Sequence, residues 1–396
     1  MMNTGTILKE ALRDRMFSPE EFVFLFSRGE KENEILAAAD EINHSLNGDR
    51  VTFVHNRNLN YTNVCVNRCS FCGFRRNEEE RDSYFWTVGE ILAKLGETPD
   101  VSEVCIQGGL HPGLEFSFVL EMLQEIRTQF PGIHIHAFSP MEIYYFSQKT
   151  GRPVRSILES LIDRGLGSLP GTAAEILDDR VRQQICPEKV NVATWVEIVK
   201  TAHRLGLKST ATILLGHVEG PDQIALHLQV LRDIQHETSG FTEFIPLPFV
   251  PFETALGRRS GIREMLPFRR IRLFYALCRL FFGRSIPNIQ ASWPKLGLDR
   301  ALECVFSGVN DLGGTLYQEN ITRSAGGVHG EKVSLGQLKR AIEKAGKTPQ
   351  LRDTLYNPLS DQLLSSLIRK EGGADHDQKE WRGPNRLPLS PLETVS

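Results

Sequence analysis

Apolar residues recur at helical spacing through the first part of the chain and then change to the alternation that strands show. Within residues 5–46 they fall three or four positions apart, and Ser18 followed by Pro19 marks the start of a helix. Residues 51–62 instead place apolar and polar side chains on alternating sides, which predicts a strand. We therefore expect residues 1–50 to form a helical N-terminal extension ahead of a region that begins with a strand.

Strand and helix patterns then alternate repeatedly. Short apolar runs predict further strands at residues 101–107, 133–138, 166–169, 209–215, 241–248 and 288–292, and a final segment at residues 308–316 ends the series. Longer amphipathic segments predict helices between them, at residues 115–130, 154–164, 173–184, 192–205, 221–235, 267–282 and 295–306. About eight strands alternating with helices predict an α/β protein with a (β/α)8 TIM-type barrel. A doubly wound sheet is the alternative, but no G-x-G-x-x-G follows the first strand.

The domain organisation follows from these patterns. The barrel is expected to occupy residues 51–330, and residues 331–370 to form a C-terminal helical extension that packs on one end of it. Residues 371–396 mix glycine, proline and charged residues, which predicts a disordered tail.

Composition and charge exclude several classes of partner. The chain has 396 residues, 40% of them hydrophobic and 24% charged, and a net charge of −3, so neither nucleic acid nor an anionic membrane is indicated. No apolar run is long enough to span a bilayer, and the N-terminus lacks the pattern of a signal peptide. These features predict a cytoplasmic protein.

Three cysteines lie close together directly after the first predicted strand. Cys65, Cys69 and Cys72 have the spacing C-x3-C-x2-C, with the aromatic Phe71 before the last of them. Crowded thiolates are stable when a metal or an iron–sulfur cluster binds them. A 4Fe-4S cluster held by three cysteines leaves its fourth iron open for another ligand. Zinc is the competing interpretation, although no second ligand pair follows, and a disulfide does not suit this context.

This spacing resembles the cysteine motif of the radical S-adenosylmethionine (SAM) superfamily, and the resemblance indicates further SAM-binding residues. Gln107, Gly108 and Gly109 end the second predicted strand and are expected to line the methionine end of SAM. Glu175 and Arg182 are predicted to share one face of a helix. Glu175 is expected to bind the ribose or amino group of SAM and Arg182 its carboxylate, although a solvated helix face is the simpler interpretation.

Two ionisable residues follow the fifth predicted strand. His217 and Glu219 stand one residue apart in Gly-His-Val-Glu, at the strand end where a barrel has its active site. They are our candidates for catalysis, by binding substrate or moving a proton. His134 and His136 lie on one face of the third strand and either reach the site or are buried and hydrogen-bonded.

Longer motifs resemble one branch of the superfamily, which holds the deazaflavin (FO) synthase subunits and the menaquinone enzymes of the futalosine pathway. The motifs are residues 134–142, 167–175, 216–219, 240–247, 290–293 and 308–315, and the resemblance extends over about residues 5–357. Within the branch, the chain is most similar to the tyrosine-using FO synthase subunit.

The resemblance implies a radical reaction. A reductant supplies an electron to the 4Fe-4S cluster, SAM is cleaved, and the resulting radical takes a hydrogen from L-tyrosine. Tyrosine then splits between Cα and Cβ, and its 4-hydroxybenzyl group joins 5-amino-6-(D-ribitylamino)uracil. The resemblance also implies that Phe71 flanks the adenine and that a partner FO synthase subunit completes the deazaflavin.

Two other functions remain open at this point. A futalosine-pathway enzyme would share the cysteine motif and the barrel, whereas a zinc-stabilised binding protein would carry no catalysis. The sequence stretches 107–112 and 138–142 favour the FO side of the branch.

Overall fold

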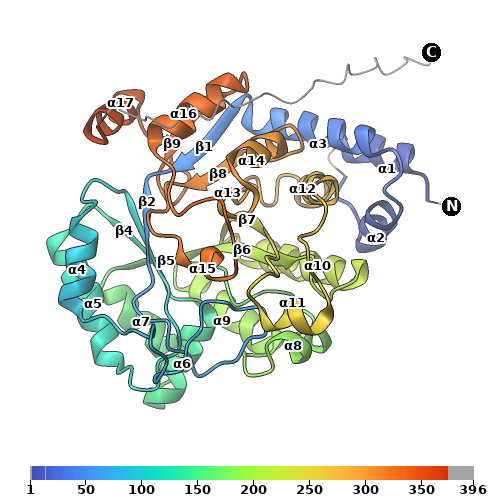
Figure 1. Cartoon of the computed structure of the whole chain (residues 1–396). Coiled ribbons are helices and arrows are strands. Elements are labelled where there is room, and N and C mark those ends of the chain that lie inside the picture. Colours follow the sequence, from blue (N-terminus) through green and yellow to red (C-terminus); the bar gives the residue numbers. More distant parts are fainter. Residues whose placement is uncertain (1, 14, 373–396) are drawn as a thin grey trace.

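Strands alternate with helices along almost the whole chain in the computed structural model, which describes residues 2–13 and 15–372 (Figure 1). The strands are β1 (Arg50–Val54), β2 (Asn56–Leu59), β3 (Glu103–Ile106), β4 (His134–Ala137), β5 (Leu166–Leu169), β6 (Lys208–Leu215), β7 (Phe241–Pro248), β8 (Asp311–Gly314) and β9 (Thr348–Arg352).

The helices lie before, between and after these strands. They are α1 (Thr4–Ala11), α2 (Pro19–Arg28), α3 (Glu32–Asn47), α4 (Val88–Gly96), α5 (Phe116–Gln129), α6 (Pro140–Thr150), α7 (Val154–Asp163), α8 (Asp179–Ile185), α9 (Val192–Arg204), α10 (Pro221–Thr238), α11 (Ala255–Ser260), α12 (Phe268–Phe282), α13 (Trp293–Leu296), α14 (Leu298–Val305), α15 (Asn320–Ser324), α16 (Leu335–Lys344) and α17 (Asp361–Lys370). No helix in the described ranges is both long and apolar enough to cross a membrane.

A parallel sheet in the order β2-β3-β4-β5-β6-β7 forms most of the barrel. Residues near position 289 link its edge strand β7 to β8, and its other edge strand, β2, reaches the residues after β8 through a bridge between Arg57 and Tyr317. Phe244 of β7 bridges to Ile289, Gln290 bridges to Asp311 of β8, and β8 pairs with β1. The α/β class and the TIM-type barrel are therefore as predicted. The six-stranded sheet is continuous, whereas the contacts that close the barrel between β7 and β8 are single bridges.

The first predicted strand is in fact two strands with different partners. The backbone carbonyl of His55 accepts hydrogen bonds from the N–H groups of Ser102 (2.8 Å) and Glu103 (3.3 Å). Before this point β1 pairs with β8 and β9, and after it β2 pairs with β3. The alternation in the sequence could not reveal the break, because the change of partner depends on segments far along the chain.

The predicted helix over residues 173–184 begins later than expected. Helix α8 starts at Asp179, with the Asp178 side chain accepting from the N–H of Val181. Ala173 and Glu175 have φ angles of 62° and 41°, in the left-handed region, so the chain cannot be helical there. Residues 172–177 form a loop instead, and Glu175 and Arg182 do not share a helix.

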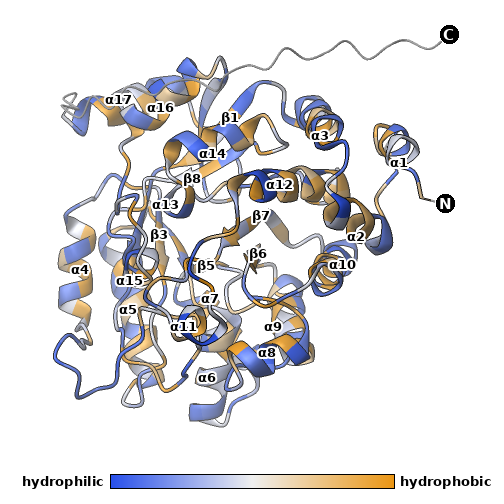
Figure 2. Cartoon of the chain, turned by 45° about the vertical axis from the view of Figure 1, so that its right-hand side comes forward, coloured by the Kyte–Doolittle hydropathy of each residue, from blue (hydrophilic) through white to orange (hydrophobic). Residues whose placement is uncertain are grey.

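The N-terminal helices pack on the outside of the barrel, as expected. Helix α2 begins with a capping box in which Ser18 and Glu21 exchange hydrogen bonds, with Pro19 as the first helical residue. Its Phe22 makes edge-on contacts with Phe274 and Phe281 of α12, at ring-centroid distances of 6.1 Å. Apolar and polar residues are mixed along α2, α10 and α12 (Figure 2), as in helices that bury one face.

The segment from α16 to α17 covers the end of the barrel where the strands begin. Helices α16 and α17 and strand β9 lie at the top of Figure 1, away from α6, α8 and α11 at the bottom. Strand β9, which was not predicted, pairs with β1 along its whole length. Its polar sequence, Thr-Pro-Gln-Leu-Arg, lacks the alternation that marks most strands. The proposed domain boundaries at 50, 330 and 370 remain a proposal, and the predicted tail lies almost entirely outside the described residues.

A buried ionic network seals this end. Arg352 of β9 donates to both carboxylate oxygens of Asp311, at 2.6 and 3.1 Å, and lies 3.7 Å from a Glu243 oxygen. The Tyr356 hydroxyl donates a hydrogen bond to Glu243 Oε2 at 2.5 Å. Burial raises the pKa of Glu243 to about 7, and Arg352 acts in the opposite direction. Arg352 therefore compensates two buried carboxyl groups at once.

We expect Arg352→Met to lower the free energy of unfolding by about 3–5 kcal/mol, because it leaves buried carboxylates without their cation. Urea denaturation measures this loss. Lys200→Met is the control, because Lys200 pairs with Glu237 on the surface, and its midpoint should stay close to that of the unchanged protein. Equal midpoints for the two variants would contradict the role of the network.

Candidate active site

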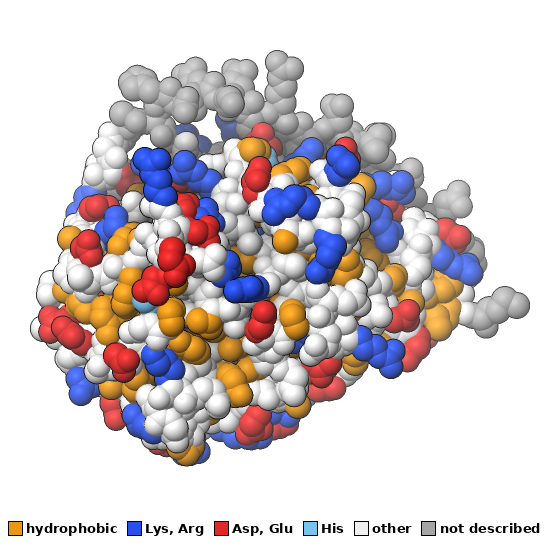
Figure 3. Space-filling model, turned by 60° about the horizontal axis from the view of Figure 1, so that its bottom comes forward, with side chains coloured by type: hydrophobic (Ala, Val, Ile, Leu, Met, Phe, Trp, Pro, Cys, Tyr) orange, Lys and Arg blue, Asp and Glu red, His pale blue; other side chains and the backbone are white. Residues whose placement is uncertain are grey.

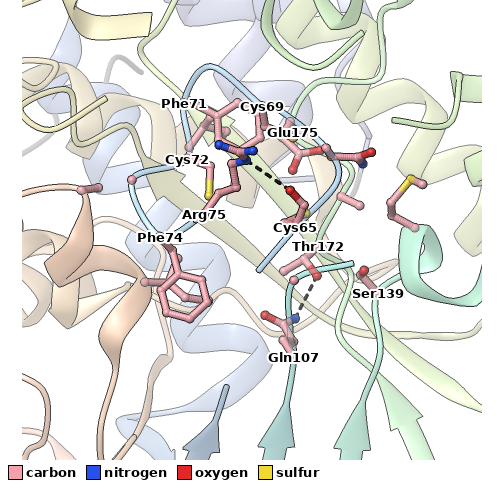
Figure 4. A pocket seen from close by; sticks show the side chains of 18 of the residues that line it. Cys65, Cys69, Phe71, Cys72, Phe74, Arg75, Gln107, Ser139, Thr172 and Glu175 are labelled. Atoms are coloured by element: carbon pink, nitrogen blue, oxygen red, sulfur yellow. Dashed lines mark hydrogen bonds between the residues drawn. The ribbon is translucent and has the colours of Figure 1, made fainter. Parts of the chain in front are cut away.

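A cavity opens where several of the parallel strands end. Its wall comes from the loop after β2, the turn after β3, the start of α6, the loop before α8, the ends of β6 and β7, and helices α13 and α15. Figure 4 shows the cysteine side chains together with Arg75 and Glu175, near Gln107, Thr172 and Ser139 at the ends of neighbouring strands. The position agrees with the rule that a parallel barrel carries its site at the carboxyl ends of its strands.

The face over α6, α8 and α11 is partly apolar. Figure 3 views the molecule from this side, and apolar side chains gather near the middle of the face with charged side chains scattered around them. Exposed hydrophobic residues near the cavity include Val66 of the cysteine loop and Ile321 of α15.

The loop that carries the three cysteines is held mainly by its backbone. The Val66 N–H donates to the Leu110 carbonyl at 3.0 Å, and the Ser70 N–H donates to the Ile185 carbonyl at 2.8 Å. The Ser70 carbonyl in turn accepts from the N–H of Leu256 at 2.6 Å. The loop is therefore fastened to the turn after β3, to α8 and to α11, which are separate parts of the barrel mouth.

Cys65, Cys69 and Cys72 all line the cavity and are free thiols. Burial raises the pKa of Cys65 and of Cys69, and the nearby Lys189 ammonium works against this rise by favouring the thiolates. Three thiols that share a cavity with a cation fit a group that binds thiolates and carries positive metal ions.

The thiols do not converge on one point. Among residues 2–13 and 15–372, no three side chains of His, Cys, Asp or Glu are arranged to hold a single metal ion. A 4Fe-4S cluster needs no such convergence, because each cysteine binds a different iron. A mononuclear zinc site, in contrast, requires its ligands to surround one ion. The arrangement thus suits the cluster better than the zinc alternative.

Gln107, Gly108 and Gly109 line the cavity, but their backbone N–H groups already have partners within the protein. The Gly108 N–H donates to Glu142 Oε1 at 3.1 Å, and the Gly109 N–H to the Thr62 carbonyl at 2.9 Å. A Cβ on Gly108 would lie 2.5 Å from the Tyr61 ring. Gly108 and Gly109 are therefore required for packing against the loop after β2, and their contact with the methionine end of SAM stays a prediction.

Glu175 lines the cavity and is held by a cation that the sequence did not single out. Its Oε1 accepts from Lys189 Nζ at 2.6 Å, whereas its buried Oε2 has no hydrogen-bond partner among the described residues. Lys189 also lies over the Phe71 ring, 5.4 Å from its centroid. Phe71, Glu175 and Lys189 thus form one contiguous part of the cavity wall.

Arg182 does not line the cavity. Its guanidinium donates to the backbone carbonyls of Ala173 (3.2 Å), Ala174 (2.7 Å) and Val190 (2.6 Å), and lies 3.8 Å from a Glu175 oxygen. Arg182 is fully buried behind the loop and holds it in its left-handed conformation. Binding of the SAM carboxylate by this side chain stays a prediction, and its contacts support a positioning role, because its donors are directed to the protein backbone.

His217 and Glu219 also lie outside the cavity lining. Glu219 accepts from the N–H groups of Gly216 (2.5 Å) and His217 (2.8 Å), and its Oε2 is 3.0 Å from His217 Nδ1. Both side chains are buried, and these bonds close the turn after β6 on itself. Their catalytic role stays a prediction, and the contacts support a structural one. His134 and His136 are likewise below the cavity, where both contact Ser168 Oγ at 2.7 Å.

Sequence reasoning missed four charged residues of the cavity wall, namely Arg75, Glu142, Lys189 and Lys295. Glu142 could have been noticed, because Ser139 and Glu142 form a capping box directly after β4. Burial raises its pKa, while hydrogen bonds from Ser139 and Gly108 oppose the rise. Lys189 and Lys295 carry no comparable pattern in the sequence.

Comparisons with known proteins agree with this geometry. The family described as "Radical SAM superfamily" matches residues 59–231, and "CofH/MqnC C-terminal region" matches residues 238–363. A protein of Methanopyrus kandleri, named 5-amino-6-(D-ribitylamino)uracil–L-tyrosine 4-hydroxyphenyl transferase, is 45% identical over 82% of this chain and 89% of its own. A protein of the same name from Methanothermobacter thermautotrophicus is 42% identical over 91% of this chain and 100% of its own.

A solved structure is similar in fold. The crystal structure of methylornithine synthase (PylB) covers 87% of this chain and 97% of its own, with a TM-score of 0.68 at 18% sequence identity. At that identity the likeness concerns the fold alone.

We expect Gly109→Ala to disturb the cysteine loop, because the new Cβ would lie 2.2 Å from the Val64 carbonyl oxygen and 3.1 Å from Cys65 Cβ. Relief of this overlap requires a backbone shift that costs about 1–3 kcal/mol. Iron and sulfide content after anaerobic reconstitution, together with the melting temperature, should both fall. Gly96→Ala is the control, because nothing lies within 4 Å of its added Cβ. Full iron loading of Gly109→Ala would show that the contact does not position the loop.

Proposed function

This chain belongs to the radical SAM superfamily and, within it, to the family of 5-amino-6-(D-ribitylamino)uracil–L-tyrosine 4-hydroxyphenyl transferases, and we propose that it catalyses the reaction of that name. L-Tyrosine is cleaved between Cα and Cβ, and its 4-hydroxybenzyl group is joined to the ribitylaminouracil. The observation that carries the proposal is the high identity to proteins of this name over 82–91% of the chain, which includes both the cysteine loop and the C-terminal part of the cavity wall.

Cys65, Cys69 and Cys72 are the residues we propose to hold the 4Fe-4S cluster. Their support is that all three open onto one cavity and that Lys189 favours the thiolate forms of Cys65 and Cys69. When bound, the reduced cluster and SAM together supply a 5′-deoxyadenosyl radical, which removes a hydrogen atom from the substrate. The remaining tasks, which are to bind, orient and exclude water, fall to the side chains of the cavity wall.

Glu175 is the residue we propose to bind SAM directly. Its Oε1 is neutralised by Lys189, and its Oε2 is buried without a hydrogen-bond partner among the described residues. Its closest cation, Arg182 Nη1, is 3.8 Å away, too far for a hydrogen bond. A buried carboxylate oxygen that accepts no hydrogen bond is costly, so a ribose hydroxyl or an ammonium group of a ligand that donates to it would stabilise it. Phe71 lies beside this pair and offers its ring to the adenine. Arg182 acts indirectly, as a positioning residue for the loop that carries Glu175.

The rest of the cavity suits an aromatic substrate and a reaction that must avoid water. Leu247, Phe249 and Val250 from the end of β7 form an apolar wall, continued by Ile321 of α15. Such a wall can pack against the tyrosine ring and limits the access of solvent to a reactive radical. We further propose that a separate reductant supplies the electron and that the product passes to a partner FO synthase subunit.

An anaerobic incubation tests this function. The reconstituted protein with SAM, a chemical reductant, L-tyrosine and 5-amino-6-(D-ribitylamino)uracil should consume tyrosine and form the coupled product, detected by mass spectrometry. Cys69→Ala should lose both the cluster absorbance and the cleavage of SAM, because one iron ligand is removed. Cys304→Ala is the matched control, because Cys304 is buried in α14 away from the cavity, and it should keep both.

Three outcomes would count against the proposal. Retention of cluster and SAM cleavage by Cys69→Ala would remove the cluster from this loop. One zinc per chain in place of iron and sulfide would favour a zinc-stabilised binding protein. Consumption of a futalosine derivative, with tyrosine left unchanged, would move the protein to the menaquinone side of the branch.

A further inference from the structure

One ammonium group in the cavity wall has no partner. Lys295 belongs to the short helix α13 and lines the cavity together with Ile321 of α15 and Ala325, the residue that follows this helix. Within the described part of the chain, its Nζ forms neither a hydrogen bond nor an ion pair. The side chain is half-buried, and an ammonium withdrawn from water without a counter-charge is unfavourable.

The other basic residues of the wall are already occupied. Lys189 is paired with Glu175 at 2.6 Å. Arg75 donates to the Cys65 carbonyl at 3.2 Å and to the Asn77 side chain. Lys295 is therefore the one lysine or arginine of this wall, among described residues, that is left for a ligand.

Glu319 is the carboxylate that acts electrostatically on Lys295, but its hydrogen bonds are made elsewhere. Both Glu319 oxygens accept from the N–H of Thr322, at 3.1 Å each, and so cap the start of α15. Burial lowers the pKa of Lys295, and Glu319 acts in the opposite direction without forming an ion pair. A ligand carboxylate beside Lys295 would stabilise its charged form further.

The helix that carries Lys295 is attached to the barrel by its first residue, Trp293. Trp293 Nε1 donates to the Gly314 carbonyl at 2.9 Å, which fastens α13 to the end of β8. Helix α15 lies directly against the cysteine loop, because a Cβ on Gly73 would approach the Ser324 carbonyl oxygen to 2.3 Å. Lys295 is thus presented from a firmly attached wall that also contacts the loop of the three cysteines.

We propose that Lys295 binds the α-carboxylate of the amino-acid substrate, L-tyrosine, and so determines which end of that substrate faces it. The inference rests on the function proposed above. SAM also carries an amino-acid carboxylate, so two ligands of this protein, SAM and L-tyrosine, could place a carboxylate beside Lys295. The substrate is favoured because Lys295 lies in residues 238–363, the part matched by the branch-specific C-terminal family, whereas the general superfamily match ends at residue 231.

The surroundings of Lys295 fit the two parts of this substrate. The ammonium supplies a charge-assisted hydrogen bond to a carboxylate, and the apolar side chains of Leu247, Phe249 and Ile321 in the same cavity accommodate a ring. A carboxylate that is held in place also fixes the position of the adjacent Cα–Cβ bond in the cavity. The reaction requires such an orientation, because this bond is the one that breaks.

Binding of L-tyrosine and of tyramine, which lacks only the carboxylate, tests the proposal. Equilibrium dialysis is performed on anaerobic holoprotein with SAM and without reductant, so that no turnover occurs. The unchanged protein should prefer L-tyrosine by about 10- to 100-fold, the usual range for a hydrogen bond to a charged group. Lys295→Met and Lys295→Gln should bind the two ligands equally, and Lys295→Arg should retain part of the preference. Lys344→Met, an exposed change on α16, should behave like the unchanged protein.

The arms of the experiment separate the possible failures. Absence of tyrosine binding to the unchanged protein would overturn the proposed function itself. A preference for L-tyrosine that persists in both Lys295→Met and Lys295→Gln would overturn the role of Lys295 and leave the function intact. Weaker SAM binding in these variants, with the tyrosine preference unchanged, would assign Lys295 to the SAM carboxylate and also overturn the proposal.

Discussion

The position of the three thiols depends on backbone hydrogen bonds that leave the cysteine loop in three directions. Val66 is joined to Leu110 after β3, and Ser70 is joined both to Ile185 of α8 and to Leu256 of α11. Each such bond contributes only about 0.5–1.5 kcal/mol net, so no single one determines the loop conformation. The combination does, and it makes the geometry of the thiols a property of the whole barrel mouth.

The charges around the cavity are distributed so that almost all are satisfied before any ligand binds. Glu175 is neutralised by Lys189 and supported from behind by Arg182, whose own donors are used on backbone carbonyls. Two groups depart from this pattern among the described residues. Glu175 Oε2 accepts no hydrogen bond and has Arg182 only at 3.8 Å, and Lys295 Nζ forms neither a hydrogen bond nor an ion pair. One is an acceptor and the other a cation, and they come from different parts of the wall. A ligand that binds these two groups would therefore gain the most free energy from them.

The two ends of the barrel use buried charge in different ways. At the end where strands begin, Arg352 is saturated by Asp311 and Glu243, and this network attaches the C-terminal segment to the strands. At the opposite end, the wall keeps unpaired groups and an apolar surface beside the thiols. A saturated network contributes rigidity and seals the interior, whereas unpaired groups contribute affinity for a ligand.

The amino-acid sequence by itself determined the α/β barrel, the placement of the cysteine loop at a strand end and the family branch. Periodicity, motif spacing and strand-end position are local properties, and for the same reason Phe71, Gln107 and Glu175 could be assigned to the cavity side. Tertiary structure alone decided the rest. Arg182 turns away from the cavity and donates to the carbonyls of the loop in which Ala173 and Glu175 adopt left-handed backbone angles, and Lys189 and Lys295 enter the wall through packing between distant segments. The direction of a side chain depends on such long-range contacts, which no pattern of neighbouring residues records.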